Sequence, residues 1–140
     1  PISHSYSSQG SYTVIINNQL DSFNFSSFSK PLTIDQWGST LWKTMYRAFF
    51  RCEDLNISAV DIPDLGQVTS LEQMFAGAVS FNSDLSDWDV SNVTDMSGMF
   101  YNVVFVGATS SFNQPLNNWN VSNVTNMSQM FDNAESFNQP

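Results

Sequence analysis

A repeated motif constrains this chain more than any other feature of its 140 residues. The segment FNSDLSDWDVSNVTDMSGMF at residues 81–100 returns as FNQPLNNWNVSNVTNMSQMF at residues 112–131. A Met-Phe pair marks the same point of each repeat and occurs at residues 74–75, 99–100 and 130–131, at intervals of 25 and 31. The longer interval contains one insertion, so the sequence predicts a period of 25 residues with a single inserted loop.

The pattern within one repeat indicates a strand followed by a helical turn. Apolar residues typical of strands gather at 85–90, and those at 93–100 recur at helical spacing. Between them stand Ser91 and Asn92, which are good helix N-cap residues. Leucine-rich repeats have periods of ~20–29 residues with one strand and one short helical piece. We therefore expect an α/β solenoid, a leucine-rich-repeat-like right-handed coil of short parallel strands and short helical turns.

Such coils must stack, because neither a short helix nor a lone strand is stable alone. The recurrent Phe, Trp, Leu, Val and Met positions are then expected to form ladders in a continuous core. Asn82, Asn113 and Asn138 each follow a ladder Phe, where buried amides would satisfy backbone groups of the next coil. Residues that tolerate the left-handed conformation at a helix end follow each Met-Phe pair: Gly77, Asn102 and Asn133.

The repeat pattern also divides the chain. Residues 1–30 do not repeat and read as an N-terminal β-hairpin-like cap, whereas residues 31–140 form one solenoid unit. Residues 34–50 show helix-compatible spacing and make the transition between the two. The pattern breaks off within SFNQP, so we expect the solenoid to be truncated at its C-terminus and to belong to a longer protein.

A degraded coil precedes the clear repeats. Counting back 25 residues from the Met-Phe pair at 74–75 leads to Phe49 and Phe50. Four apolar residues of the intervening stretch then take core positions of the next repeat: Val60, Leu65, Val68 and Leu71.

The charge balance argues against two classes of partner. The chain has 13 acidic and 4 basic residues, a net charge of −9, and its Lys and Arg residues all lie within 1–51. Nucleic-acid binding requires cations that displace counterions from phosphate, so we expect no nucleic-acid partner. Because no apolar run is long enough to cross a bilayer, we expect no membrane insertion by this segment either.

No arrangement of side chains indicates catalysis. His4 is the only histidine and lies far in sequence from Cys52, the only cysteine. A nucleophile with its base and orienting group is therefore not apparent, and we expect a non-enzymatic protein without a cofactor. Cys52 is interpreted as a small buried hydrophobic residue.

A cluster of carboxylates raises the question of calcium. Asp84, Asp87, Asp89 and Asp95 supply the oxygen ligands that Ca²⁺ takes. The next repeat replaces all of them with residues that cannot continue a metal ladder: Pro115, Asn118, Asn120 and Asn126. Solvated acidic loops are the favoured interpretation, no metal ligands are assigned, and one weak site remains the lesser alternative.

Two further repeated residue types are interpreted as structural. The Met residues stand at ladder spacing, which favours core packing over soft-metal binding. Thr94 and Thr125 recur once per repeat inside the expected helical turn, too sparsely to indicate an ice-binding or polysaccharide-binding array.

The inserted loop is the candidate contact site. Its apolar residues would form an exposed patch, which usually marks an interaction surface, and insertions in repeats often map to the binding face. The alternative, equally weighted, is that Phe105 packs under the loop and seals a gap. The candidate partner-contact residues are Tyr101, Val103, Val104, Phe105 and Val106.

The motifs WDVSNVTDMSGMF and WNVSNVTNMSQMF resemble those of the BspA-like leucine-rich-repeat surface proteins of bacteria and some protozoa, over roughly residues 30–140. HSYSSQGSYTVII, near the N-terminus, is similar to the final strands of a polycystic-kidney-disease-type (PKD) domain. The first resemblance implies a secreted, cell-surface or lipoprotein location and adhesion to a host or matrix protein or a glycan. It carries over no catalytic residues. A structural spacer that projects another domain is the alternative function.

Overall fold

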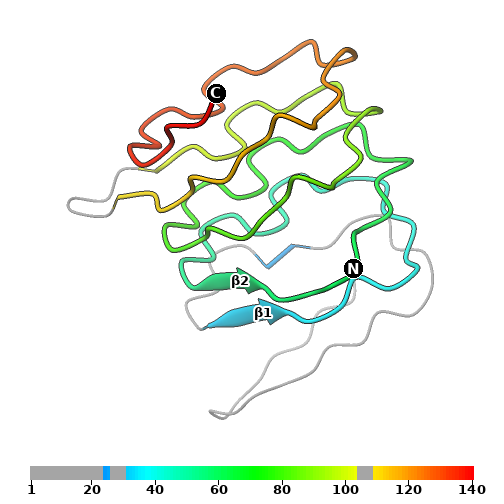
Figure 1. The fold of residues 1–140 in the computed structure, drawn as a ribbon, viewed down its shortest axis with the longest axis horizontal. Coiled ribbons are helices and arrows are strands. Elements are labelled where there is room, and N and C mark those ends of the chain that lie inside the picture. Colours follow the sequence, from blue (N-terminus) through cyan, green and yellow to red (C-terminus); the bar gives the residue numbers. More distant parts are fainter. Residues whose placement is uncertain (1–23, 26–30, 104–108) are drawn as a thin grey trace.

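The structure of the chain is a computed structural model, which describes residues 24–25, 31–103 and 109–140 (Figure 1). The cap predicted for residues 1–30 therefore lies outside the described residues, apart from Asn24 and Phe25. The PKD-like hairpin lies wholly outside them.

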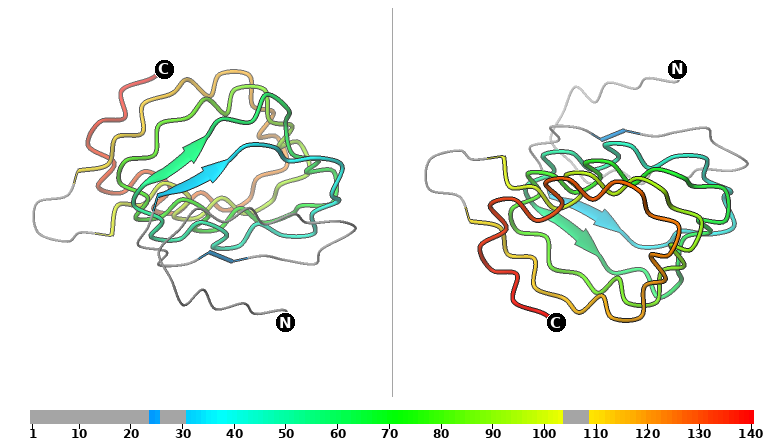
Figure 2. Two further views of the ribbon diagram at one scale, coloured as in Figure 1. Left: turned by 90° about the horizontal axis from the view of Figure 1, so that it is seen from below. Right: turned by 90° about the horizontal axis from the view of Figure 1, so that it is seen from above.

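The described chain winds into coils that stack on one another (Figures 1 and 2). Strand β1 (Leu32–Ile34) opens the first coil and pairs in parallel with β2 (Leu55–Ile57), which opens the second. We number the coils by these starts: 32–54, 55–79, 80–110 and 111–135. The backbone N–H of Thr94 donates to the carbonyl of Thr69, and that of Thr125 to Thr94, across 25 and 31 residues. The predicted period with one insertion is confirmed.

The predicted helical turns are wrong. The described residues contain no helix, and β1 and β2 are their only strands, so the chain is not the α/β solenoid that the repeat length suggested. None of the described residues forms a helix of the length and apolarity that a bilayer crossing requires. Residues 34–50 also lack a helix and belong to the first coil.

A run of β-turns takes the place of each expected helix. In the second coil, Met74 and Ala76 donate their N–H groups to carbonyls three residues back, as in β-turns. The residues between them behave differently: Gln73, Phe75 and Gly77 donate to carbonyls of the third coil at 2.9–3.0 Å. Half of the N–H groups therefore bind the neighbouring coil and cannot take part in helix hydrogen bonds.

Two physical constraints exclude the helix. Gln73 and Gly77 have positive φ values, 53° and 73°, which an α-helix does not accommodate. Backbones that share hydrogen bonds lie ~4.8 Å apart, whereas an α-helix with side chains is ~10 Å wide. The left-handed conformation predicted for Gly77 and Asn133 is confirmed, but Asn102 does not adopt it, and the residues sit within turns instead of ending helices.

The strand expected at 85–90 is also absent. Side chains replace the backbone acceptors that would extend the β1–β2 ladder: Ile57 N–H donates to Ser83 Oγ at 3.0 Å. Asn113 N–H donates to Asn82 Oδ1, and Asn138 N–H to Asn113 Oδ1, both at 2.9 Å. The role predicted for Asn82 and Asn113 is confirmed. They lie at the surface, however, and are not buried.

Stacked phenylalanine rings form the centre of the core. One ladder has centroid spacings of 5.4–6.1 Å and comprises Phe25, Phe49, Phe75, Phe100 and Phe131. A second has spacings of 5.8 and 6.0 Å and comprises Phe81, Phe112 and Phe137. Rings of the two ladders also stack on each other at 4.0–4.3 Å. The predicted aromatic ladders are confirmed.

Most other predicted core positions are buried as well. Leu65, Val68 and Leu71 are at most 2% exposed, and Cys52 is fully buried. Val60 is the clear exception, because it is fully exposed although the repeat places it in the core. Val60 therefore contributes to the surface of the second coil.

Candidate interaction surface

The inserted loop is described only at its two ends. Tyr101 and Val103 are half-buried, whereas Val104, Phe105 and Val106 lie outside the described residues. The Tyr101 carbonyl accepts the N–H of Gly77 at 2.9 Å, so the loop leaves the stack from a fixed point. Whether its apolar residues form a contact patch or pack inward stays a prediction.

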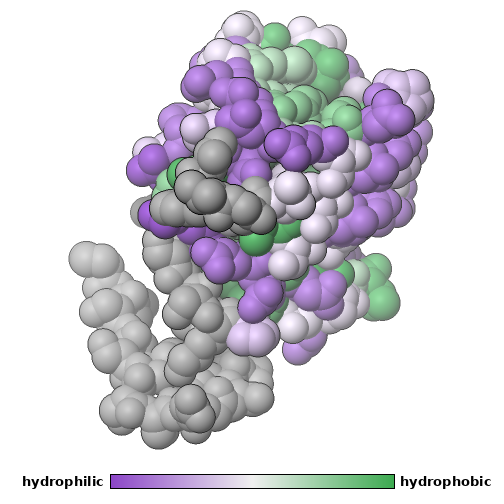
Figure 3. All heavy atoms as spheres, turned by 90° about the vertical axis from the view of Figure 1, so that its left-hand side faces the viewer, coloured by the Kyte–Doolittle hydropathy of each residue, from purple (hydrophilic) through white to green (hydrophobic). Residues whose placement is uncertain are grey.

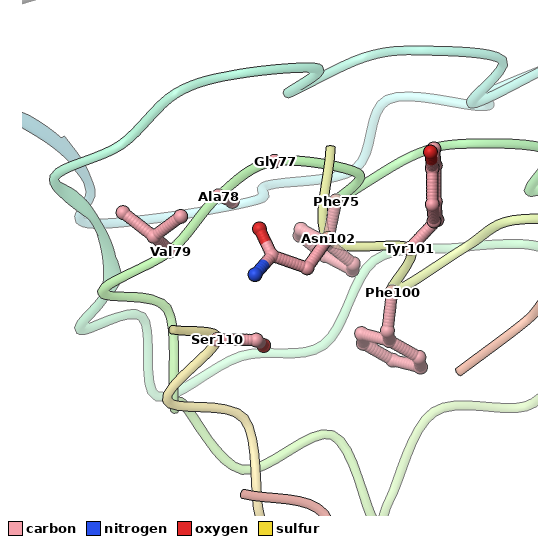
Figure 4. A pocket seen from close by; sticks show the side chains of 8 residues that line it. All are labelled: Phe75, Gly77, Ala78, Val79, Phe100, Tyr101, Asn102 and Ser110. Atoms are coloured by element: carbon pink, nitrogen blue, oxygen red, sulfur yellow. The ribbon is translucent and has the colours of Figure 1, made fainter. Parts of the chain in front are cut away.

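A small hollow lies at the neck of the insertion (Figure 4). Asn102 points its amide into this hollow, which Val79 and Ser110 also line, while the Tyr101 ring points away. Asn102 N–H donates to the Asp132 carbonyl at 3.0 Å, so the next coil holds the neck. The hollow offers about 10 Å³ to solvent, which is room for about one water molecule and far below the ~300–1,000 Å³ of ligand pockets.

The surface around the neck is mostly polar. Figure 3 views the stack from the left-hand side of Figure 1, and hydrophilic residues cover most of the described surface there. Hydrophobic residues gather at the top, around the last coil. In that coil Val121 and Met127 are exposed, although their counterparts Val90 and Met96 are buried, because no full coil of the described chain stacks above them.

A larger hollow, of about 320 Å³, lies along residues 62–66 and reaches Asp89 in the next coil. One departure in the repeat lies within it. Pro63 stands where Trp88 and Trp119 stand in the following coils, 25 residues on and then a further 31. Both Trp rings are buried, and the Trp88 ring meets the Trp37 ring of the first coil at a centroid distance of 5.5 Å. The hollow is shallow and mainly apolar.

Exposed apolar side chains flank this larger hollow. Ile62 is 51% exposed and Val60 fully exposed. The first coil holds this segment outward, because the Ala59 N–H donates to the Ile34 carbonyl at 2.9 Å. Asp61 adds two hydrogen bonds, accepting the N–H groups of Trp37 at 3.0 Å and Gly38 at 2.8 Å. Sequence reasoning missed this site, although the change from LSDWDVS to VDIPDLG at the same repeat position could have revealed it.

Two carboxylates of the cluster considered for calcium accept hydrogen bonds within turns. Asp84 accepts the N–H of Ser86 at 2.8 Å, and Asp89 that of Ser91 at 3.0 Å. Hydrogen bonds from Ser86 backbone and side chain lower the pKa of Asp84, and those from Ser91 side chain and backbone lower the pKa of Asp89. Both are therefore ionised at neutral pH. Among the described residues, no three His, Cys, Asp or Glu side chains lie together as a metal site would require.

Polar side chains form further ladders along the outside of the stack. Thr94 Oγ1 donates to the Thr69 carbonyl at 3.1 Å, and Thr125 Oγ1 to the Thr94 carbonyl at 3.2 Å. The expectation that Thr94 and Thr125 lie within a helical turn is wrong, because the described residues contain no helix. Both threonines, and Thr69 with them, are exposed. Asn92 and Asn123 likewise donate their Nδ2 groups to the preceding coil, at 3.2 and 2.7 Å. These bonds hold the surface side chains in fixed positions.

The family of the chain follows from its repeats. A family model described as "Mycoplasma protein of unknown function, DUF285" matches residues 43–140. The chain belongs to the DUF285 family. The DUF285 match spans the second, third and fourth coils together with both hollows. Neither a curated protein nor a solved structure matches the chain. The finer resemblance to BspA-like leucine-rich-repeat proteins is not confirmed by the DUF285 match.

Proposed function

We propose that this DUF285 chain is a non-enzymatic interaction module of a cell-surface protein, which holds a repeat-built face toward a host or matrix protein or a glycan. The observation that carries the proposal is the set of side-chain ladders on its surface. Thr94, Thr125, Asn92 and Asn123 are exposed, yet each is tied to the backbone of the preceding coil. A preordered surface loses little side-chain entropy when a partner binds, which favours affinity.

The chemistry of the described surface supports binding over catalysis. The larger hollow is lined by aliphatic residues and the carboxylates of Asp64 and Asp89. Cys52 is fully buried, and its Sγ lies 3.1 Å from the Phe25 carbonyl oxygen, so the thiol is not positioned as a nucleophile toward solvent. The acidic charge of residues 52–140 disfavours a nucleic-acid partner.

The surface location rests on the sequence motifs. The segments WDVSNVTDMSGMF and WNVSNVTNMSQMF resemble those of BspA-like bacterial surface proteins, whose members include secreted proteins and lipoproteins. A relation of this DUF285 chain to that group is part of the proposal. Adhesion by many modest contacts along the stack is the expected mode of binding.

A structural spacer is the second candidate function, and the continuous core favours it. The first phenylalanine ladder runs without a break from Phe25 to Phe131. Each coil adds ~4.8 Å along the stack, so such a module can project another domain over a set distance. A spacer needs no specific partner, which separates it from the interaction module experimentally.

The test is binding of the 140-residue chain to an array of extracellular-matrix proteins and glycans. Two variants accompany it: Val104→Asp with Phe105→Ser in the insertion, and Asn123→Lys on the ladder surface. Near-UV circular dichroism confirms that each variant folds. Specific binding that one variant loses and the other keeps supports the interaction module and locates its face. Absence of binding by the unaltered chain refutes the module and favours the spacer.

A further inference from the structure

The larger hollow has an unusual surface for this chain. Outside the hollow the second coil buries apolar residues such as Val68 and Leu71, which are both 0% exposed. Beside the hollow, Ile62 and Val60 are exposed instead. The floor itself is mainly apolar, with Pro63 in the place of a tryptophan. An exposed apolar surface with a preformed depression is typical of a contact site.

Two carboxylates lie at the edge of this depression. Asp64 and Asp89 stand at the same position of successive coils, so their backbones lie about one coil apart, ~4.8 Å. Each uses one oxygen in a turn, Asp64 accepting Gly66 N–H at 2.9 Å and Asp89 accepting Ser91 N–H at 3.0 Å. Both side chains are exposed, and the four Lys and Arg residues of the sequence all lie within residues 1–51.

This combination selects the chemistry of a partner. A guanidinium group has five donors in a planar fork and pairs with carboxylates in a bidentate manner. An arginine can therefore contact Asp64 and Asp89 together, while an adjacent apolar side chain fills the depression beside Ile62. An anionic partner would meet two negative charges, and a purely apolar one would partly desolvate those charges without pairing them.

We infer that the hollow formed by residues 62–66 and Asp89 is a docking site for a partner-protein segment in which arginine alternates with apolar residues. This inference rests on the proposed function, because it names the partner of an interaction module. This site is separate from the insertion, since its residues are 62–66 and Asp89 and none of them lies within 101–112.

The test uses three blocked hexapeptides titrated into the 140-residue chain: acetyl-RLRLRL-amide, its glutamate counterpart ELELEL and its serine counterpart SLSLSL. We expect saturable binding of the arginine peptide with a Kd below about 1 mM, weakened by added salt. The other two peptides are expected not to bind. Nuclear magnetic resonance shifts should change at residues 60–66 and 89.

Matched variants assign the charge and the apolar contributions. Asp64→Asn with Asp89→Asn removes both charges but keeps the turns, because Asn120 already holds the equivalent turn with Ser122 at 3.2 Å. We expect this variant to bind the arginine peptide roughly tenfold more weakly, since two exposed ion pairs are lost. Ile62→Ser should weaken binding by removing apolar contact. Asp132→Asn, which removes a charge elsewhere, is the control and should bind unchanged.

Three results would overturn the inference: no saturable binding of the arginine peptide, binding that the Asp64 and Asp89 changes leave intact, or equal weakening by the Asp132 control. The matrix and glycan array separates this failure from failure of the proposed function. If the chain binds a partner there, and the Asp64 and Asp89 variant binds it equally well, the module function stands and the hollow is not its site.

Discussion

Removal of the Phe100 ring is the sharpest test of the stacked core. The ring is 3% exposed and lies where the two ladders meet, with centroids 5.8 Å from Phe75, 4.0 Å from Phe112 and 5.4 Å from Phe131. A buried Phe→Ala change costs about 3–5 kcal/mol. Three ring contacts, each worth ~0.5–1.5 kcal/mol beyond area burial, place Phe100→Ala near the upper limit, about 5 kcal/mol.

Phe137→Ala is the matched control, because it removes the same side chain from the end of a ladder. Phe137 is half-buried and stacks on two rings, Phe112 at 6.0 Å and Phe131 at 4.1 Å. We expect a loss of about 2 kcal/mol, less than the usual ~3–5 kcal/mol for a fully buried ring.

Equilibrium unfolding in urea measures both losses. With a denaturant slope of about 2 kcal/mol per molar, the midpoint should fall by about 2.5 M for Phe100→Ala and by about 1 M for Phe137→Ala. Equal shifts for the two variants would refute the argument that ring stacking in a continuous core sets the cost. A clear drop in the slope for Phe100→Ala would show that the coils unfold independently, which also contradicts a continuous core.

Three further predictions concern the turns and ladders, and urea unfolding measures each of them. Gly77 and Gly38 both have positive φ, but only at Gly77 would a new Cβ lie 3.0 Å from the preceding coil. We therefore expect Gly77→Ala to cost about 2 kcal/mol of stability and Gly38→Ala about 1 kcal/mol. Equal costs would contradict this reasoning. Backbone hydrogen bonds, chiefly the one from Trp37, lower the pKa of Asp61 below the usual 3.8. The ionised carboxylate therefore stabilises the fold fully above pH 3.8, and this stabilisation is lost as the pH falls through the lower pKa of the folded state. The unfolding midpoint should therefore fall less between pH 7 and pH 3 in Asp61→Asn than in the unaltered chain, and an unchanged pH dependence would rule this out. Asn82→Ala should cost about 1 kcal/mol by removing the acceptor of a backbone N–H in the next coil, whereas Asn82→Asp, which keeps the acceptor, should cost less.

The helical expectation failed for a reason that can be stated at single residues. Buried residues in the second coil recur at Leu71, Met74, Phe75 and Ala78, and this spacing of three and four is the signature of a helix face. A run of β-turns with positive φ at residues 73 and 77 produces the same spacing. The pattern of apolar residues cannot distinguish a helix from this run of turns. The two structures bury the same side chains and differ only in the carbonyl that accepts each backbone N–H.

The larger hollow escaped sequence reasoning for a related reason. The repeat places Val60 at the position of Leu85, which is 1% exposed. In the structure the hydrogen bonds of Asp61 to Trp37 and Gly38 hold the segment toward the first coil instead. That contact joins residues 23 and 24 positions apart, and no local pattern near Val60 indicates it. The exposed Val60 and Ile62, and with them the candidate docking site, follow from it.

The sequence by itself determined the 25-residue period, the site of the insertion and every residue of the phenylalanine ladders except Phe25. It could do so because identical residues at a constant interval can stack only if the chain makes one circuit in that interval. Tertiary structure alone decided which acceptors the backbone N–H groups of each coil bind. In the second coil, Gln73, Phe75 and Gly77 give their N–H groups to the third coil, and their partners exist only once the coils lie ~4.8 Å apart. Hydrogen bonding between coils at that spacing replaces the helices that the local pattern favours.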